Sequence, residues 1–436
     1  MEMLLKIAGL IFKETGSLML NDFYWIMLII IIFMYRRTAG VELTVLGKQF
    51  PMLEKLSGSV LLGMMGGLVG SLLVVFMGIT IESYTSVDQG ALYSGILYLW
   101  VIAILLAFID PRYLCFSYAG GIVAMANLLT GFPNIYAPGL LALIGILHLI
   151  ESFLIWLDGY TYAVPLFIKR KNGEIVGGFM MNKMWAIPLL ILGVGVGATA
   201  SGGSLINSLM DSAGKMLVPH MPEWWPLVKQ PGLLKTGMAL AYMPLLVPVV
   251  LGYGDMAITR SPEKRCSDSA QKLALYSVIL IALAAMASVF RPFGFAAAVF
   301  APAAHEFLIV RGKREEEEGI PFYGAAEEGI RVLYPRKGSP SDKMKLKPGE
   351  IILSINNMPL NYESQLTEFL SQGPSYIWMN IKDCDGKIRT VEYRDYSNGV
   401  TSIGALIVSR NTDLYFEINE ERASLIKRII RRFRRK

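Results

Sequence analysis

The sequence predicts an α-helical polytopic membrane domain of eight or nine spans, followed by a small α/β domain and a basic C-terminal helix. Three observations support this fold class. Hydrophobic residues make up 53% of the chain and charged residues only 17%, whereas soluble domains carry roughly a quarter charged residues. The charges are concentrated between long apolar segments and after residue 310. Beyond that point the periodicity changes to that of short strands and one short helix.

Residues 1–310 contain the predicted spans, because a spanning helix needs about 20 mainly apolar residues. The sixth segment is rich in glycine and is compatible with a partly re-entrant element, and the ninth contains two prolines and a His–Glu pair. An eight-span count would require a re-entrant helix or an extracellular tail. The predicted spans lie near residues 20–35, 58–80, 91–109, 113–130, 137–157, 185–203, 236–253, 270–290 and 292–310.

Positive charges between the spans predict the orientation, because cytoplasmic loops carry an excess of Lys and Arg. Such charges lie within 36–55, 169–183, 260–265 and 311–314, whereas the loop "IESYTSVDQG" has none. Nine spans with the N terminus outside and the C-terminal domain in the cytoplasm satisfy this pattern. The chain is therefore expected to be a multi-pass protein of the cell membrane.

Residues 311–327 form a predicted acidic linker containing "EEEE", and residues 328–410 form the small α/β domain. The segments "GIRVLYP" and "EIILSI" are short β-rich runs, and "YESQLTEFLSQG" has helical spacing. A hairpin signal, "DCDGK", and a last strand, "TSIGALIVSR", follow. This order, with "GSPSDKMKLKPGEIILSINNMPL", resembles a bacterial PDZ domain of the kind found in HtrA-type and site-2 proteases.

PDZ domains bind an extended peptide as an added strand, and a glycine-containing loop holds the peptide carboxylate. The resemblance implies that Ser402, Ile403, Gly404 and Ala405 form this loop, with Leu406 and Ile407 at the groove edge. The alternative is an ordinary closing strand. With no basic residue nearby, an internal peptide is also compatible with the site.

The sequence predicts no catalytic site, no metal site and no cofactor. The segment "HEFLI" starts like the zinc motif H-E-x-x-H, but Ile309 stands where the second histidine is needed. The chain has three histidines, and its three cysteines are far apart in the sequence. An enzyme is therefore not expected.

Two side chains in the fifth span are candidates for an intramembrane polar pair. His148 and Glu151, in "LHLIESF", lie one helical turn apart. Ionisable residues at membrane depth usually face the interior of the bundle and often mark a pathway. The alternative is a mutual hydrogen bond that fixes helix packing.

Glycines at four-residue spacing predict close helix contacts within the chain. They are Gly63 with Gly67, Gly66 with Gly70, and Gly193 with Gly197.

The tail, residues 411–436, is predicted to be a basic amphipathic helix on the membrane surface. Apolar residues at spacings of three and four fall largely on one side, and cations cover the rest. Such a helix binds anionic lipids, and a partner-binding helix is the alternative. The membrane-surface residues are Lys427, Arg428, Arg431, Arg432, Arg434 and Arg435.

The segments "CFSYAGG", "HLIES" and "VGGFMMNKMWAIPL", together with the C-terminal domain, resemble the MinJ-like family of cell-division topology factors of Gram-positive bacteria. The resemblance implies a membrane-anchored scaffold at septum and poles. Its PDZ domain would recruit partner proteins, namely a division-site scaffold and a division inhibitor, and no nucleic-acid partner is expected. A transporter or a membrane-protease regulator with a regulatory PDZ domain is the alternative. The strongly basic tail is not expected of the family.

Overall fold

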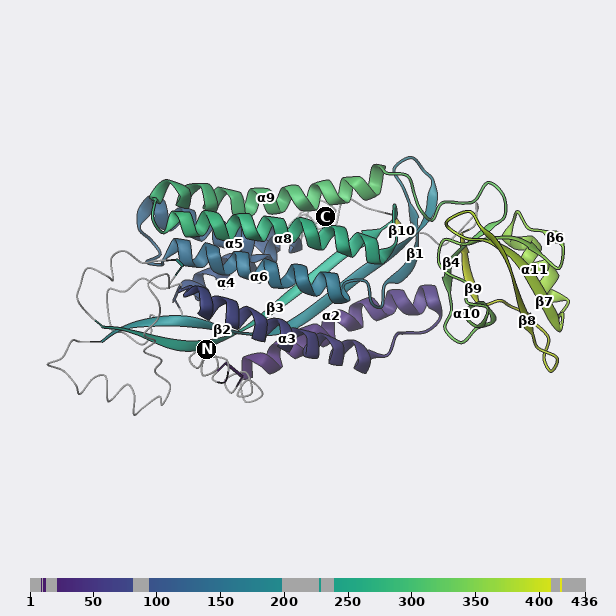
Figure 1. Ribbon diagram of the computed structural model, residues 1–436, viewed down its shortest axis with the longest axis horizontal. Helices are drawn as coiled ribbons and strands as arrows, with labels where there is room; N and C mark the ends of the chain where they lie inside the picture. Colours follow the sequence, from purple (N-terminus) through teal and green to yellow (C-terminus); the bar gives the residue numbers. More distant parts are fainter. Residues whose placement is uncertain are drawn as a thin grey trace, which may run out of the picture.

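The computed structural model describes residues 9, 11–12, 22–80, 94–197, 227–228, 239–408 and 416–417. Within them, an elongated apolar domain carries a strand-rich C-terminal domain at one end (Figure 1). The helices of the apolar domain run along its long axis. They are α2 (Asp22–Leu46), α3 (Met52–Met77), α4 (Ser94–Ile109), the 3₁₀ helix η3 (Pro111–Leu114), α5 (Phe116–Thr130), α6 (Ala137–Asp158), α8 (Pro262–Ala287) and α9 (Arg291–Glu318).

Four of the described helices, α3, α6, α8 and α9, are long and apolar enough to cross a membrane. Helices α4 and α5 are apolar but shorter. The helices expected near 58–80, 137–157, 270–290 and 292–310 are therefore confirmed as helices of suitable length and composition.

The segments expected as spanning helices at 185–203 and 236–253 are strands where the structure describes them, so this expectation is wrong there. Strand β2 (Ile175–Gly197) pairs antiparallel with β3 (Ala239–Ala257), and Pro188 lies opposite Pro248. Proline has no N–H to donate, and inside a helix it costs roughly 3 kcal/mol. With a further proline in β3, Pro244, these segments are poor helix formers in spite of their hydropathy.

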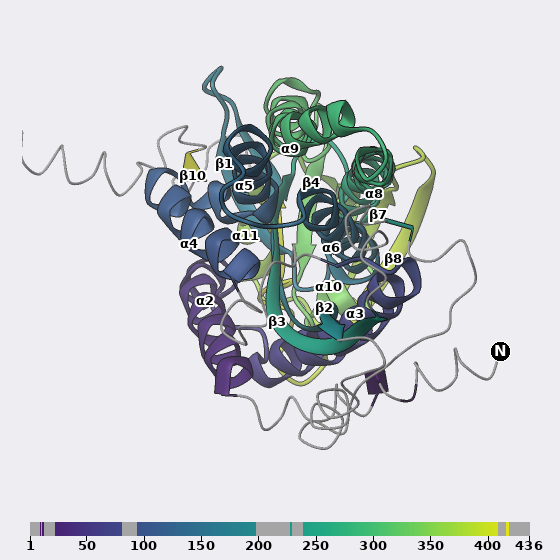
Figure 2. The same cartoon turned by 90° about the vertical axis from the view of Figure 1, so that its left-hand side faces the viewer.

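The β2–β3 hairpin lies between α2 and α3 on one side and α6 and α8 on the other (Figure 2). A Cβ atom on Gly63 of α3 would lie 2.1 Å from the carbonyl oxygen of Ala186, and one on Gly67 would lie 2.5 Å from that of Pro188. The predicted close packing of these glycines is thus intramolecular, but its partner is a strand. Gly66 and Gly70 instead face α6 side chains, and Gly193 and Gly197 lie in β2.

Side chains from α2 and α3 bond to the backbone of β2 where β1 (Val164–Lys169) no longer pairs with it. The β1 pairing covers residues 175–180 of β2. Beyond it, the amide of Met184 donates to Tyr35 Oη over 3.2 Å, and the amide of Leu190 donates to Ser71 Oγ over 2.8 Å. A buried backbone N–H without a partner is costly, so these contacts stabilise the strand inside the apolar domain.

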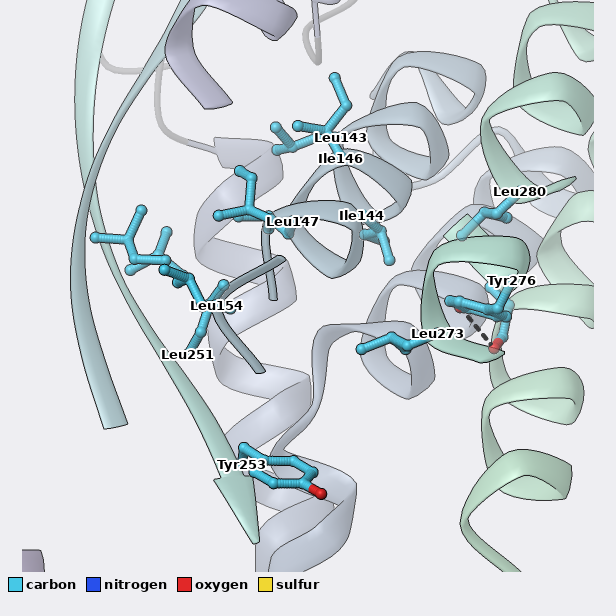
Figure 3. Close-up of a cluster of buried hydrophobic side chains, with 14 of the residues drawn as sticks. Leu143, Ile144, Ile146, Leu147, Leu154, Leu251, Tyr253, Leu273, Tyr276 and Leu280 are labelled. Atoms are coloured by element: carbon cyan, nitrogen blue, oxygen red, sulfur yellow. Dashed lines mark hydrogen bonds between the residues drawn. The ribbon is translucent and has the colours of Figure 1, made fainter. Parts of the chain in front are cut away.

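Helix α6 occupies the centre of the apolar domain. Its side chains pack against Leu251 and Tyr253 of β3 on one side and against Leu273, Tyr276 and Leu280 of α8 on the other (Figure 3). Most of its residues are buried, including Leu140, Ile144 and Leu154. A helix that is apolar all round is expected in such a position.

The C-terminal domain has the predicted order of strands and helices. Helix α9 extends through Glu318, so residues 311–318 of the predicted linker are helical. The sheet order is β8-β7-β5-β4-β9, with β6 paired to β5, and β10 (Phe416–Glu417) pairs with β1 of the apolar domain. The elements are β4 (Ile330–Pro335), α10 (Pro340–Lys343), β5 (Ile351–Ile355), β6 (Met358–Pro359), α11 (Glu363–Ser371), β7 (Tyr376–Lys382), β8 (Ile388–Arg394) and β9 (Ala405–Val408).

The contact between α3 and the hairpin can be tested with two glycines of the same helix. Gly63→Ala places a methyl group against the backbone oxygen of Ala186, whereas a Cβ on Gly58 would have no atom within 4 Å. We expect Gly63→Ala to destabilise the chain by about 1–3 kcal/mol and Gly58→Ala to leave it as stable as the parent or slightly more stable. Thermal unfolding of the purified chain in detergent measures both. Equal melting temperatures for Gly63→Ala and the parent would contradict the α3–β2 packing.

Candidate functional sites

The predicted peptide-binding loop is held against the start of α10 by backbone hydrogen bonds. The carbonyl oxygen of Ile403 accepts from the amide of Ser341 over 2.8 Å, and that of Gly404 accepts from the amide of Arg336 over 2.9 Å. The amide of Gly404 donates to Ser402 Oγ over 3.0 Å. The loop is therefore held by hydrogen bonds within the chain, and a carboxylate would compete with Ser402 for this amide.

Gly404 is required by the conformation of the loop. Its φ is +68°, in the left-handed region that favours glycine, and a Cβ would lie 2.4 Å from the Cβ of Ser339. A substitution here disturbs the loop itself, so a change of Gly404 does not separate peptide binding from folding.

The six predicted peptide-binding residues fall into three environments. Ile403 and Ile407 are buried in the core of the C-terminal domain. Leu406 packs toward the apolar domain. Ser402 is exposed, while Gly404 and Ala405 are half-buried. The backbone of the loop and the side chains of Ser402 and Ala405 are therefore the parts that a ligand could contact.

The C-terminal domain is joined to the apolar domain through a shared core. Tyr323, Leu333 and Val408 are buried in the same cluster as the residues of α6 and α8. The amide of Gly177 donates to the carbonyl oxygen of Tyr323 over 2.9 Å, and a Cβ on Gly177 would lie 2.7 Å from Leu333 Cδ1. Burial raises the pKa of the Tyr323 phenol, so this side chain stays neutral. The two domains thus pack directly on each other.

Glu316, at the end of α9, is the centre of a buried ion network beside this shared core. Its side chain is 3% exposed, and Oε2 accepts from the amides of Ile258 and Thr259, each over 2.7 Å. Oε1 lies 3.4 Å from Arg260 Nε and 3.5 Å from Arg265 Nη1. This carboxylate therefore ties the end of α9 to the residues that follow β3.

Further ion pairs extend the network. Arg265 donates from Nε to Asp255 over 2.8 Å, and Lys171 pairs with Glu317 over 3.1 Å. Arg170 Nη2 donates to the carbonyl oxygens of Glu317 and Gly319. Three segments predicted to be cytoplasmic, near 170, 260–265 and 311–314, thus lie at the end of the apolar domain that carries the C-terminal domain (Figure 1).

Two cations assigned from sequence to cytoplasmic loops are buried instead. Lys55 pairs with Glu42, and Lys183 donates to Asp158 Oδ1 over 2.9 Å. Trp185 Nε1 donates to the other oxygen of Asp158 over 3.2 Å. These pairs join α2 to α3 and α6 to β2.

Two further residues lie beside the predicted polar pair of α6. His148 Nε2 lies 4.0 Å from Glu151 Oε2 on α6. Cys115 Sγ lies 3.1 Å from His148 Nε2 and 3.6 Å from His305 Nε2 of α9. We call Cys115, His148 and His305 the Cys–His cluster. Among the described residues its three ligand atoms lie within 4.8 Å of one another, close enough to hold a metal ion.

Close helix packing produces this cluster. Cys115 immediately precedes α5, whose glycines lie against two other helices. A Cβ on Gly120 would lie 2.0 Å from Ile144 Cδ1 of α6, and one on Gly121 would lie 2.7 Å from the carbonyl oxygen of Ala298 of α9. The segment "CFSYAGG" thus contributes both a ligand atom and the small residues that let α6 and α9 approach it.

Sequence spacing did not connect Cys115 with His305, because 190 positions separate them. Cys115 belongs to no ligand spacing in the sequence, and Ile309 breaks the zinc motif that begins at His305. The available signal was that two of the chain's three histidines and one of its three cysteines lie in predicted spans or directly beside them.

The predicted membrane-surface residues Lys427 to Arg435 lie outside the described residues, as does most of the long loop between β2 and β3.

No family model matches the chain. The chain is 24% identical over 405 residues to the cell division topological determinant MinJ of Bacillus subtilis (strain 168), which covers 91% of this chain and 94% of that protein. Probable cell division topological determinants MinJ of Lacticaseibacillus paracasei and Lacticaseibacillus casei (strain BD-II) match at 22% identity over 87 residues, 20% of this chain and 24% of each relative. The resemblance to MinJ-like proteins is thereby confirmed.

Among solved structures, the PDZ domain of the SdrC-like protein from Listeria monocytogenes matches at 17% identity. The match covers 19% of this chain and 92% of that domain, with a TM-score of 0.17.

The junction network can be tested by removing its central carboxylate. In Glu316→Ala, the amides of Ile258 and Thr259 lose their acceptor and Arg265 loses one partner, and breaking a buried ion pair costs about 3–5 kcal/mol. We expect these two amides to exchange hydrogen for deuterium much faster in the full chain. Glu318→Ala, on the same helix but with an exposed side chain paired to Arg314, is the control and should change little. Equal exchange rates in the two variants would contradict the assignment.

Proposed function

We propose that the chain is a non-enzymatic, membrane-anchored scaffold that recruits partner proteins through its C-terminal domain and takes part in placing the cell-division machinery. The observation that carries this proposal is the similarity to the MinJ of Bacillus subtilis, which extends over 91% of this chain and 94% of that protein. A likeness of this extent includes both the apolar domain and the C-terminal domain.

The packing between the domains supports a scaffold role. A recruiting domain on a long flexible linker samples many positions, whereas this domain shares a core with the apolar domain through Tyr323, Leu333 and Val408. A bound partner would therefore be held at a fixed place relative to the membrane.

The proposed recruiting surface is the edge of β9 with the loop before it, residues 402–407. Within the described part of the chain, β9 pairs with β4 alone, so its other edge has no strand partner. An extended peptide can add to such an edge through backbone hydrogen bonds. In this role Ile403 and Ile407 would hold the strand in the core, and Ser402 and Ala405 would lie nearest the ligand.

We further propose a multi-pass arrangement with the C-terminal domain in the cytoplasm and the protein at septum and poles. The cations around Glu316 and Glu317 lie at the same end as the C-terminal domain. This supports the orientation, because an excess of Lys and Arg is typical of the cytoplasmic side.

The recruiting surface predicts a division phenotype that depends on Ala405. In cells whose own copy of the gene is deleted, we expect the parent chain to restore septum placement. Ala405→Arg should fail, because a bulky cation at the start of β9 blocks an added strand. Ser397→Arg, in an exposed turn after β8, is the matched control and should restore placement.

Septum positions are scored by microscopy, with the amount of each variant in the membrane measured in parallel. Normal placement in the deletion strain would refute the division role, and normal placement with Ala405→Arg would refute the recruiting surface.

The basic tail predicts salt-sensitive lipid binding. We expect a peptide of residues 417–436 to bind vesicles containing anionic lipid, each cation contributing about 1 kcal/mol near the surface, and to bind less as salt rises. A peptide with the six predicted cations replaced by Gln is the control and should bind weakly. Sedimentation with vesicles measures both. Equal binding to neutral and anionic vesicles, or none at low salt, would favour a partner-binding helix.

A further inference from the structure

The Cys–His cluster brings together three ligand atoms from separate parts of the chain. Cys115 comes from the connection between η3 and α5, His148 from α6 and His305 from α9. The two histidines are 3% and 9% exposed. Their rings lie 5.1 Å apart, centroid to centroid, and Tyr118 and Tyr276 lie against them at 5.4 Å. The ligand atoms are therefore enclosed by aromatic rings and packed helices.

Outer hydrogen bonds orient both imidazoles in the same way. Nδ1 of His148 lies 2.8 Å from the carbonyl oxygen of Ile144, which can only accept, so this nitrogen carries the proton. Nδ1 of His305 lies 3.5 Å from Tyr118 Oη, whose own proton is donated to Glu306 over 2.6 Å. Each Nε2 is left with its lone pair directed at Cys115. Metal-binding histidines characteristically donate their other ring N–H in this manner.

The protein supplies too few protons for these lone pairs. Ser117 Oγ lies 3.3 Å from His148 Nε2, but its proton is used elsewhere. Tyr276 donates to the carbonyl oxygen of Ala301 over 3.0 Å, so the 2.6 Å contact between Ser117 and Tyr276 uses the hydroxyl proton of Ser117. The single S–H of Cys115 then faces the Nε2 atoms of both His148 and His305. One buried acceptor is left without a donor, and such an arrangement costs free energy unless a cation occupies it.

The two sulfur–nitrogen distances are close to those around a tetrahedral ion. With Zn–S near 2.3 Å and Zn–N near 2.0–2.1 Å, sulfur and nitrogen ligands on one ion lie roughly 3.6 Å apart. The observed separations from Cys115 Sγ are 3.1 and 3.6 Å. A thiolate with two imidazoles is a ligand set that suits zinc.

Glu151 is the carboxylate available for a fourth position. Its Oε2 lies 4.0 Å from His148 Nε2, and its side chain is 15% exposed. The other nearby carboxylate, Glu306, already pairs with Arg112 over 3.0 Å and with Tyr118. One thiolate and one carboxylate would neutralise a divalent ion, and a neutral site is the least costly kind in apolar surroundings.

We propose that Cys115, His148 and His305 bind one Zn²⁺ ion, with Glu151 as the fourth ligand. The ion would be structural, because it would cross-link the start of α5 to α6 and α9, and no step of a reaction is assigned to it. This inference rests on the geometry of the cluster and is independent of the proposed division role.

The test is the zinc content of the full chain, purified in detergent with an affinity tag that contains no histidines. We expect about one zinc per chain in the parent, measured by elemental mass spectrometry after loading with zinc and removal of the excess. Cys115→Ser and His305→Gln should lose most of it, with zinc affinity at least roughly 10-fold weaker by competition with a chelating dye. The matched controls are Cys266→Ser, a buried cysteine of α8, and His220→Ala, the remaining histidine, which should both keep the zinc.

Cobalt provides a readout that separates ligation from folding. Co²⁺ bound by the parent should give a near-ultraviolet thiolate-to-metal absorption band that is absent in Cys115→Ser. Zinc should also raise the melting temperature of the parent and not that of Cys115→Ser, because a ligand that binds the folded state stabilises it. Equal melting temperatures of the two chains in chelator would verify that the variant folds. A parent that takes up neither ion, or a Cys115→Ser variant that keeps zinc and the cobalt band, would overturn the proposal.

Discussion

The backbone of the β2–β3 hairpin must find hydrogen-bond partners inside an apolar domain, and much of the fold follows from this requirement. In hydrocarbon or in a protein core, each unpaired N–H or C=O costs several kcal/mol. The ladder from Phe179 with Ala257 to Gly197 with Ala239 pairs one edge of β2. On the other edge, β1 pairs with the first residues, and side chains of α2 and α3 bond to Met184 and Leu190. The same requirement explains Gly63 and Gly67 of α3. A helix can approach the backbone of β2 this closely only where it has no Cβ atom.

The hairpin also connects the apolar core to the C-terminal domain. Close to its beginning, β2 bonds to Tyr323 through Gly177, and the residues after β3 are held by Glu316 of α9. The two strands and α9 therefore reach the same junction from the apolar domain. Displacing the hairpin or α9 would disturb the shared core at Leu333 and Val408. The position of the C-terminal domain thus depends on long-range contacts rather than on the linker alone.

Sequence reasoning located the apolar segments, the C-terminal domain and its order of elements, because hydropathy and turn residues are local properties. It fails at the hairpin, where hydropathy alone does not distinguish an apolar strand from an apolar helix. Pro188, Pro244 and Pro248 are the local evidence against a helix, but the pairing that makes a strand favourable joins residues 42 positions apart, from Gly197 to Ala239, or more. The polar pair of His148 and Glu151 was visible as a helical spacing. Its neighbours Cys115 and His305 were not, because tertiary packing alone brings them near.

Helix α9 carries both the histidine of the Cys–His cluster and the carboxylate of the junction. His305 and Glu316 are eleven positions apart, about 16 Å along an α-helix at 1.5 Å per residue. Eleven residues correspond to about three turns, so the two side chains project from nearly the same face. A ligand that fixes His305 against α6 would therefore also fix the rotation at which Glu316 meets Ile258 and Thr259. In this way the proposed ion, bound deep in the helix bundle, would stabilise the attachment of the C-terminal domain without touching that domain.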